Sequence, residues 1–576
     1  MGTLEKFIFA ILDSKFKKTL IIFLTIIAFF ASLMMFPTKL VLAKMLPGKS
    51  ANTFSIYVDT PKGSSIAQTK SVSSCVIDFL TKEKEVKNIE LFLGQGIPLD
   101  YAGLVKGASM KQTENVSEIA VNLTDKHHRD EPSFLMVKRL RPIIQEACES
   151  LVRGTSIKFI EQPSGPPTLA SIVVEVHGEN LSKIRALSVE IANILSNTDG
   201  LVDIDLMTDE NFVKYELIPD KEKIARSGLS VEQVNNILYL GFEGMVIAHK
   251  NSKNNPDQIP IFLVLDKESK NIPTPSKEAL QSKLSSLNLM NMKGMMVPLS
   301  EVVNIREVKS NTMIMHKDLS RMVNVIAETD MVSQVYPLLD ARDVMLEKFK
   351  KNYTITKEGF STYMFDFTLE DKKTHEKFLI RWDGEMKVTL DTFRDLGGAF
   401  ISALILIFLL LVIYYKSFAI SGIVLLGSFL SLIGVIVGHW VANFFTTETF
   451  FLTATSLIGF IALIGISSRN SLLLIDFAKS LMECEGMKKR RAIAVAAATR
   501  AKPIALTAVA IILGSALLAS DPVFGGLGVA LISGTVAAVF VSLLFVPVLM
   551  DNAKAMDFDK AAQCPAEEKK NISITK

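Results

Sequence analysis

The sequence predicts a membrane α-helical bundle of six spans, one plus five, with a large water-facing α+β region of ferredoxin-like split βαβ subdomains. Three observations support this fold class. Of the 576 residues, 49% are hydrophobic, yet 21% are charged, which is too polar for a chain lying wholly in a membrane. Six apolar runs are long enough to cross about 30 Å of hydrocarbon. About 360 residues of ordinary soluble character separate the first run from the other five.

The first span is expected over 19–37, where "TLIIFLTIIAFFASLMMF" follows a lysine-rich N-terminal segment, 1–18. A basic segment before an apolar run is also typical of a signal peptide. Here the run is long and no clear small-x-small cleavage site follows it. We therefore expect an uncleaved span.

The loop that follows is expected to hold three subdomains. In 38–167, runs such as "TFSIYVDTP" alternate like a strand, and "SIAQTKSVSSCVIDFLTKE" has apolar residues at helical spacing. The predicted order is βαββαβ, the split βαβ arrangement. After the breaker "PSGPP", a similar subdomain comprises 168–215 and 305–395. An inserted subdomain at 216–304 interrupts it.

Five more spans are expected within 397–550, before a short tail, 551–576. Lys and Arg gather before the first span and at 479–502, whereas the opposite short loops, "HWVANFFTTETF" and "ASDPVFGG", contain none. Short loops rich in Lys and Arg remain in the cytoplasm. Both termini are therefore expected there, and the large loop in the periplasm, with the chain in a bacterial inner membrane. The spans are expected at about 397–415, 419–442, 450–476, 503–520 and 524–550.

One stretch approaches a nucleotide-binding motif and is rejected. "AKMLPGKS", 43–50, is similar to a phosphate-binding loop, with Ala43 in place of the first glycine. A working loop of this kind links a buried strand to a helix N-terminus, whose amides hold phosphate. This stretch follows a membrane span and precedes a strand, so we expect an inert connector. No GxSxG or HExxH motif is present, and no enzyme, cofactor or metal site is expected.

Other polar features also predict ordinary structure. His127 and His128 lie in a polar loop and are expected to be solvated. The four cysteines show neither metal spacing nor a disulfide framework. Cys75 and Cys148 can pair only if the fold brings their helices together, and reduced, packed thiols are the expected state. The net charge of +3 predicts no nucleic-acid partner.

A charged stretch inside the fourth span predicts a functional site. "IGISSRNSLLLIDFAKS", 464–480, places Arg469, Asn470 and Asp476 in an apolar run. A charge at the bilayer centre costs about 2.5–3.5 kcal/mol on insertion scales. Asp476 is close to the cytoplasmic end and is expected to reach the surface there. Arg469 is deeper and should face a partner of opposite charge. Glu448, the other candidate acid, is also near a membrane surface, so this chain offers Arg469 no partner.

The same residues resemble a known transporter family. One span, a large loop and five spans are the topology of half of a resistance-nodulation-division (RND) transporter. "IGISSRNSLLLIDFAKSLMECEG" is similar to the tenth span of the hydrophobe/amphiphile efflux class, which carries a basic residue followed by Asn. "ATRAKPIALTAVAIILGSALLAS", 498–520, is similar to the start of the eleventh span. "MVPLSEVV", "YYKSF" and "FVPVLM" also match, and the resemblance extends from about residue 5 to 552.

The resemblance implies the carboxy-terminal half of such a transporter. The family's amino-terminal half has an adjacent aspartate pair in its fourth span, and this chain has none there. Carried over by residue, the resemblance implies a proton relay in which Arg469 opposes the missing aspartates and Asn470 hydrogen-bonds nearby. Arg500 stands at the cytoplasmic mouth of the relay, and Thr507 supplies a hydroxyl from the next span. The family's basic residue is usually lysine, whereas arginine stays charged at any accessible pH.

The resemblance also implies a function and partners. It implies half of a proton-driven permease that exports amphiphilic small molecules, with the amino-terminal half on a separate chain or lost. A trimer, a periplasmic adaptor, an outer-membrane channel and a docking role for 216–304 are implied as well. Two alternatives remain open: a SecD/SecF-like protein-export accessory, which shares the one-plus-five topology, and a non-transporting remnant. The matches at Arg469–Asn470 and Arg500–Pro503 favour the exporter. A reading frame for the amino-terminal half beside the gene would separate the exporter from the remnant.

Overall fold

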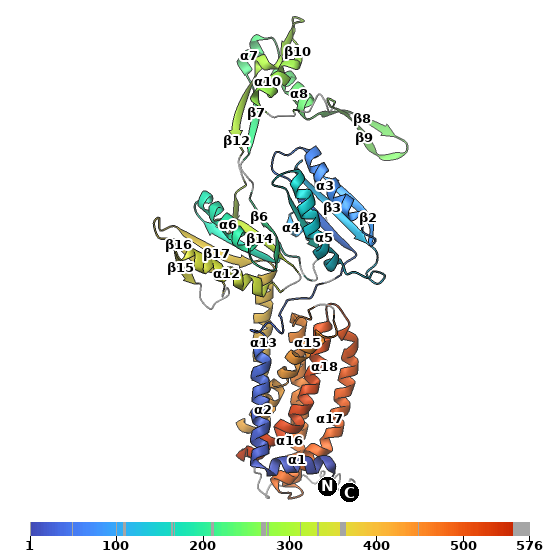
Figure 1. Cartoon of the computed structure of the whole chain (residues 1–576), viewed down its shortest axis with the longest axis vertical. Helices are drawn as coiled ribbons and strands as arrows, with labels where there is room; N and C mark the ends of the chain where they lie inside the picture. Colours follow the sequence, from blue (N-terminus) through green and yellow to red (C-terminus); the bar gives the residue numbers. More distant parts are fainter. Residues whose placement is uncertain are drawn as a thin grey trace. The chain divides into compact units, whose positions relative to one another are not determined.

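The computed structural model of the chain divides into two units (Figure 1). One comprises Met1–Met207 and Ile314–Lys576, and the other Thr208–Met313. The residues described are 2–48, 50–98, 101–107, 111–162, 165, 167–208, 212–266, 272, 276–310, 313–330, 333–357, 365–446 and 449–556. Lys49 of the rejected phosphate-loop match, Glu448 and the tail beyond 556 lie outside the described residues.

A four-stranded sheet with two covering helices forms the β1–β4 subdomain. The strand order is β2-β3-β1-β4, and every neighbouring pair is antiparallel. Helices α3 and α5 pack on the sheet through apolar residues at helical spacing, among them Val72 and Val76 of α3. Ser65 and Gln68 form a capping box that fixes where α3 begins. The elements are β1 (Thr53–Asp59), α3 (Ile66–Leu80), β2 (Val86–Leu93), α4 (Tyr101–Lys106), β3 (Val116–Leu123), α5 (Ser133–Cys148) and β4 (Ser156–Glu161).

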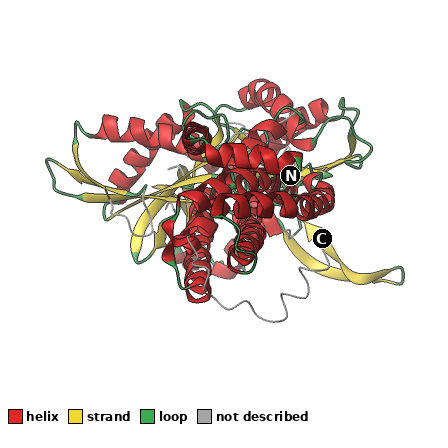
Figure 2. Ribbon diagram, turned by 90° about the horizontal axis from the view of Figure 1, so that it is seen from below, coloured by secondary structure: helices red, strands yellow, loops and turns green. Residues whose placement is uncertain are grey.

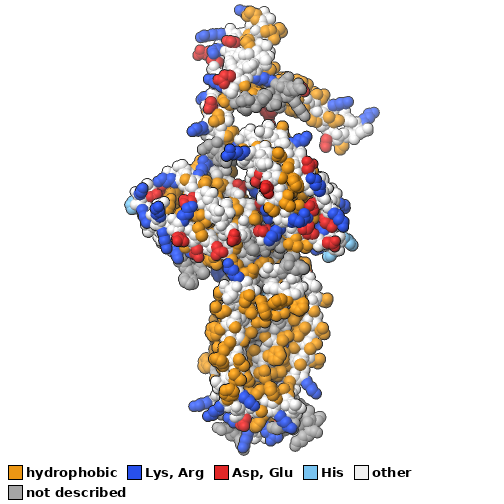
Figure 3. Space-filling model, viewed as in Figure 1, with side chains coloured by type: hydrophobic (Ala, Val, Ile, Leu, Met, Phe, Trp, Pro, Cys, Tyr) orange, Lys and Arg blue, Asp and Glu red, His pale blue; other side chains and the backbone are white. Residues whose placement is uncertain are grey.

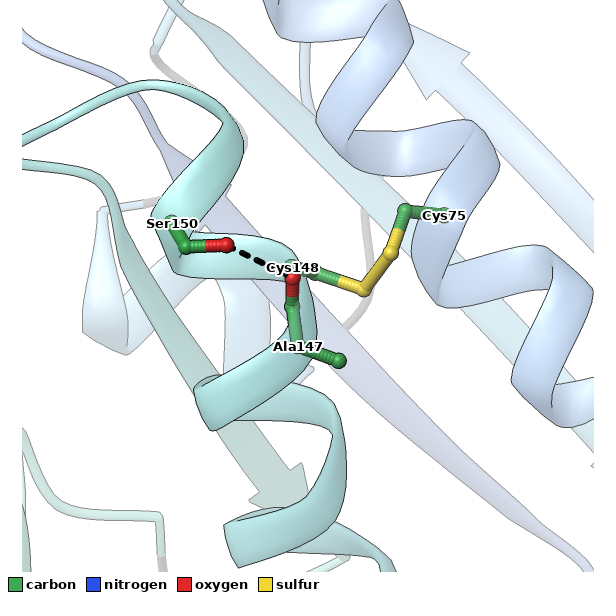
Figure 4. The surroundings of a disulfide bond; sticks show 4 residues. All are labelled: Cys75, Ala147, Cys148 and Ser150. Carbon is green, nitrogen blue, oxygen red and sulfur yellow. Dashed lines mark hydrogen bonds between the residues drawn. A yellow bond between two sulfur atoms is a disulfide. The ribbon is translucent and has the colours of Figure 1, made fainter.

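A disulfide joins Cys75 of α3 to Cys148 at the end of α5 (Figure 4), which corrects the expectation of reduced thiols. The two helices lie side by side on the sheet, so the Cα atoms of the cysteines are 5.8 Å apart. Helical periodicity predicts each helix but does not say which helices are neighbours. The pairing was therefore not visible in the sequence.

A larger sheet forms the β5–β17 subdomain. Its strand order is β13-β14-β5-β17-β16-β15, and β6 also pairs with β14. Helices α6 and α12 cover it with buried residues such as Ile184, Leu338 and Met345. The elements are β5 (Ile172–Gly178), α6 (Leu181–Ser196), β6 (Leu201–Leu206), β13 (Met315–Lys317), β14 (Ser320–Thr329), α12 (Val335–Phe349), β15 (Tyr353–Lys357), β16 (Phe367–Asp371) and β17 (Lys377–Asp383).

Charged side chains join these two subdomains at what we call the subdomain interface. Three basic residues of the β1–β4 subdomain each form an ion pair with an acidic residue of the β5–β17 subdomain: Arg141–Asp203, Lys158–Asp205 and Lys106–Glu328. The Arg141–Asp203 pair is the most buried, with 8% and 1% of the side chains exposed. This interface therefore depends on matched charge.

The second unit has its own small core. Strands β7 and β12 pair in antiparallel fashion, and Ile224, Val234 and Leu284 are buried together. Strands β8 and β9 form a hairpin in which every residue of β9 is exposed. The elements are β7 (Val213–Pro219), α7 (Lys221–Arg226), α8 (Val231–Phe242), β8 (Met245–Ser252), β9 (Asn255–Leu263), α10 (Lys277–Ser286), β10 (Asn288–Met290), β11 (Met296–Pro298), α11 (Leu299–Val302) and β12 (Val303–Lys309).

Within the described residues, six helices are long and apolar enough to cross a membrane: Lys15–Met34, Glu385–Tyr415, Phe418–Ala442, Ala454–Glu483, Lys489–Ala519 and Gly525–Asn552. Hydrophobic side chains cover this helical part, and Lys and Arg gather at its lower end in the view of Figure 3. The helices are α2 (Lys15–Met34), α13 (Glu385–Tyr415), α14 (Phe418–Phe429), α15 (Leu432–Ala442), α16 (Ala454–Glu483), α17 (Lys489–Ala519), α18 (Gly525–Phe540) and α19 (Val546–Asn552).

A further helix, α1 (Thr3–Asp13), precedes the first of these. Its residues Ile8, Ile11 and Leu12 are buried in the same core as Ala492 and Ile493 of α17. The N-terminal segment therefore packs on the bundle through one apolar face.

Small residues let the bundle helices approach closely around α18 (Figure 2 views the bundle from below). A Cβ atom built on Gly434 of α15 would lie 2.4 Å from the carbonyl oxygen of Ser533, and one on Gly534 would lie 2.2 Å from Leu463. A methyl group at Gly434 would require the Ser533 backbone to move, and one at Gly534 would require the Leu463 side chain to move. Close approach through small residues is typical of membrane helices, because lipid gives no hydrophobic drive for their association.

Helix α13 links the β5–β17 subdomain to the bundle without a break. It begins after Gly384, which has φ +83° and whose Cβ would lie 2.5 Å from the Ala170 carbonyl oxygen, so only glycine fits. Met386 and Thr389 of its first turns are buried in the subdomain. The helix then continues for 31 residues to Tyr415.

Candidate functional site

Helix α16 carries the charged stretch that the sequence singled out. Thr453 caps its N-terminus by accepting a hydrogen bond from the Ser456 backbone N–H. The helix runs for 30 residues, so Arg469 and Asn470 lie about halfway along it. Apolar residues such as Phe460 and Leu463 pack it into the bundle.

Arg469 lies on an exposed face of α16. Ile458, Ala462, Gly465 and Leu473 share this face, since they are spaced three or four residues apart, and all are exposed in this chain. No carboxylate among the described residues lies within ion-pair distance of the Arg469 guanidinium. An apolar helix face thus carries one cation that no described acidic residue pairs.

Asn470 points to a different side of the helix, into the bundle. Only 6% of the residue is exposed. Ser467 and Ser471 are buried on the same helix, and their hydroxyls have no hydrogen-bond partner in the part of the chain that the structure describes. The structure therefore separates Asn470 from Arg469 and places it in a polar strip of the bundle interior.

Arg500 of α17 is held against α16. Its guanidinium carbon lies 4.9 Å from the centre of the Phe477 ring, which is a cation–π contact. The side chain is half-buried, and its Nε has no hydrogen-bond partner within the described ranges. This contact fixes how the antiparallel helices α16 and α17 align.

Thr507 lies at the level of Arg469. From the Arg500–Phe477 contact, Arg469 is eight residues or about 12 Å along α16, and Thr507 is seven residues or about 10.5 Å along α17 in the same direction. Thr507 is exposed, and its hydroxyl reaches the carbonyls of Ile504 (2.9 Å) and Pro503 (3.1 Å) in its own helix. As far as the described residues go, no hydrogen bond or ion pair joins any two of the four predicted site residues.

Several polar contacts at the ends of the candidate spans were not predicted from the sequence. The Tyr415 hydroxyl, at the end of α13, donates a hydrogen bond to Asp476 at 2.6 Å. Asp551, at the end of the sixth candidate span, lies 2.6 Å from Lys18 and 3.4 Å from Arg490. One signal was present: all these residues stand at span ends expected on the same side of the membrane.

The site on α16 and α17 presents a positive charge and a hydroxyl group. Among the residues that the structure covers, no group of three or more His, Cys, Asp or Glu side chains could hold a metal ion. What α16 and α17 present is a permanent cation and a hydroxyl at one depth on exposed helix faces. Such a surface suits a carboxylate brought by another polypeptide.

Comparisons with known proteins agree with one another. The model of the AcrB/AcrD/AcrF family matches residues 5–362 and 368–551. The chain is 24% identical over 529 residues to the swarming motility protein SwrC of Bacillus subtilis (strain 168), which covers 90% of this chain and 44% of SwrC. Two crystal forms of a heavy metal efflux pump share the fold with a TM-score of 0.70, at 18% and 17% identity, over 95% of this chain and 51% of the pump. The chain thus spans about half the length of these relatives.

Proposed function

Because the chain belongs to the AcrB/AcrD/AcrF family of RND efflux permeases, which are transporters rather than enzymes, we propose that it is the carboxy-terminal half of a proton-driven exporter. It works with an amino-terminal half that supplies the aspartates of the proton relay. The large loop is periplasmic, both termini are cytoplasmic, and the chain resides in the inner membrane. The complete pump is a trimer that meets a periplasmic adaptor and an outer-membrane channel.

The observation that carries the proposal is the position of Arg469. A guanidinium in the middle of a membrane helix needs a partner of opposite charge, and this chain leaves it on an exposed face with none among the described residues. Carboxylates of a second polypeptide complete the pair. Thr507, at the same depth, is placed to hydrogen-bond the same carboxylates, while Asn470 and Arg500 support the relay from the bundle interior and from its cytoplasmic end.

We propose small amphiphilic molecules as the substrates, because the span motifs are similar to the hydrophobe/amphiphile class. Heavy-metal ions are the alternative, since the matched structures are those of a heavy metal efflux pump. The family match over most of the chain favours an exporter over a SecD/SecF-like accessory.

The test reconstitutes the chain in proteoliposomes with and without an RND amino-terminal half that carries the aspartate pair. Uptake of ethidium, a fluorescent amphiphilic cation, is followed after a pH jump. We expect transport only with both halves, and Arg469→Met should abolish it, because the aspartates lose their cation. The amino-terminal half should also copurify less with the Arg469→Met chain.

Arg491→Met is the matched control, since Arg491 is an exposed arginine outside the apolar part of the next helix; it should transport normally. Transport by the chain alone under an imposed proton gradient would overturn the proposal. Equal transport by the Arg469→Met and Arg491→Met chains would do the same.

A further inference from the structure

A charged cavity lies where the two subdomains of the first unit and the start of α13 meet. Its volume is about 160 Å³. Six ionisable side chains line it, from six different segments of the chain: Lys44, Lys106, Arg141, Glu161, Glu328 and Glu385. None of them belongs to the site on α16 and α17.

Three of these side chains, Lys106, Arg141 and Glu328, already have partners of opposite charge. Glu328 of β14 accepts hydrogen bonds from Lys106 (2.8 Å) and from the Ser171 hydroxyl (2.5 Å). Arg141 of α5 lies 3.2 Å from Asp203 and 3.5 Å from Asp330. These contacts hold the two subdomains together, and in each of them a charge near the cavity is paired with one of opposite sign.

Glu161 is different. It is the last residue of β4 and is half-buried at the cavity wall. No hydrogen bond or ion pair to its carboxylate occurs among the described residues. Arg141 and Lys44 attract its negative charge, whereas Glu328 and Asp330 repel it. Lys106 and Glu385 complete the charged groups on the cavity wall.

Burial raises the pKa of Glu161 to about 7, and Glu328 and Asp330 act in the same direction, although Arg141 and Lys44 lower it. A carboxyl with this pKa is partly protonated in a neutral solution. Asp59 of the same subdomain, by contrast, keeps a pKa of about 2 despite burial, because Lys158 and Lys111 pair with it. Glu161 differs from Asp59 because no described Lys or Arg forms an ion pair with its carboxylate.

We propose that Glu161 is a proton-binding site of the subdomain interface, and that proton uptake from solvent by its carboxylate strengthens the contact between the β1–β4 and β5–β17 subdomains. Protonation forms one O–H bond and removes one half-buried negative charge. The repulsion from Glu328 and Asp330, which lie across the interface in the β5–β17 subdomain, then disappears. The attraction to Arg141 is lost as well, but Arg141 belongs to the same subdomain as Glu161, and the Arg141–Asp203 and Lys106–Glu328 ion pairs stay intact.

The direction of the pH dependence follows from linkage. The pKa of Glu161 is raised from its ordinary 4.5 to about 7 when the interface is closed. Protonation of Glu161 therefore stabilises the closed interface fully when the pH is below about 4.5. Between pH 4.5 and 7, the equilibrium constant for closing falls by up to about tenfold per pH unit. Above pH 7 this stabilisation is lost. Mildly acidic solution closes the interface and neutral solution loosens it.

The first test is infrared difference spectroscopy of the full chain in nanodiscs between pH 8.5 and 5.5. A protonated carboxyl C=O band should appear with a midpoint near pH 7 and should be missing in Glu161→Gln. The matched control is Glu146→Gln, an exposed glutamate on α5, which should keep the band. A band of unchanged amplitude in Glu161→Gln, or no band titrating above pH 6, overturns the proposal.

The second test measures hydrogen exchange in peptides covering β6, which carries Asp203 and Asp205. Relative to Glu161→Gln, wild-type protection should fall as the pH rises from 5 to 7 and level off above 7. Glu161→Asp keeps a titrating group and should shift the midpoint if Glu161→Gln folds poorly. Identical pH profiles for wild type and Glu161→Gln contradict the proposal. Neither measurement involves transport or a second half, so its result is independent of the proposed function.

Discussion

The subdomain interface and the helix bundle around α18 hold their parts together by opposite means. In the bundle, a methyl group on Gly434 would meet the backbone of Ser533, and one on Gly534 would meet the side chain of Leu463. At the subdomain interface, long charged side chains meet across the gap. The packing around α18 is therefore sensitive to volume, whereas the interface is sensitive to charge. A contact of the second kind can open and close in water without losing its specificity.

The strongest way to break this comparison is to remove one charge at the subdomain interface. Arg141→Met should cost about 3–5 kcal/mol, because it leaves Asp203 buried and unpaired. The free energy of opening, measured from hydrogen exchange in β6, reports the loss. Arg139→Met on the same helix is the control, since Arg139 is 44% exposed and pairs at the surface with Glu83; it should cost at most about 1 kcal/mol. Equal costs would contradict the role given to buried charge.

The disulfide tests whether a covalent link within the β1–β4 subdomain acts separately from the charges at the subdomain interface. Replacing Cys75 and Cys148 together by serine should destabilise the β1–β4 subdomain by about 2–4 kcal/mol, since the bond closes a long loop of the unfolded chain. Hydrogen exchange of α3 and α5 measures this, and reduction of the wild-type chain should reproduce it. If protection changes in β6 instead of α3 and α5, the bond acts on the interface and not within the subdomain.

The smallest expected effect is in the bundle. Gly434→Ala should cost about 1–3 kcal/mol, because the new methyl meets the Ser533 carbonyl. Gly422→Ala on α14 is matched to it, since a Cβ there meets nothing within 4 Å; it should be neutral or stabilising by up to about 1 kcal/mol. The midpoint of unfolding in mixed detergent micelles compares the two. A pH dependence of either effect would weaken the contrast with the interface.

Local sequence patterns predict the helices and strands of this chain, but they do not predict which of these elements lie side by side. The alternation around Phe54 and Ile56 and the helical spacing of Val72 and Val76 indicate a strand and a helix because burial follows those periods. The Cys75–Cys148 bond depends on which helices lie side by side, and no local pattern carries that information.

The candidate site divides in the same way. The cost of a charge in an apolar run makes Arg469 visible in the sequence. Its exposed position, and the common depth of Thr507, need the packing of α16 against α17. At the subdomain interface the sequence carries a similar signal: Arg141 stands at helical spacing from Val137 and Ile144, on the buried face of α5. A charge on an apolar face outside the membrane points to a partner just as one inside it does.

Helix α13 is a single rod of 31 residues, about 46 Å long, that is fixed at both ends. Met386 holds one end in the β5–β17 subdomain, and the Tyr415 hydroxyl holds the other on Asp476. Between them stands the pair Gly397–Gly398, where a methyl group would meet nothing within 4 Å, so packing does not require glycine. Each glycine weakens the helix by about 1 kcal/mol relative to alanine. The rod is thus most compliant at this joint, and a torque applied to the subdomain reaches the bundle as a bend at one place.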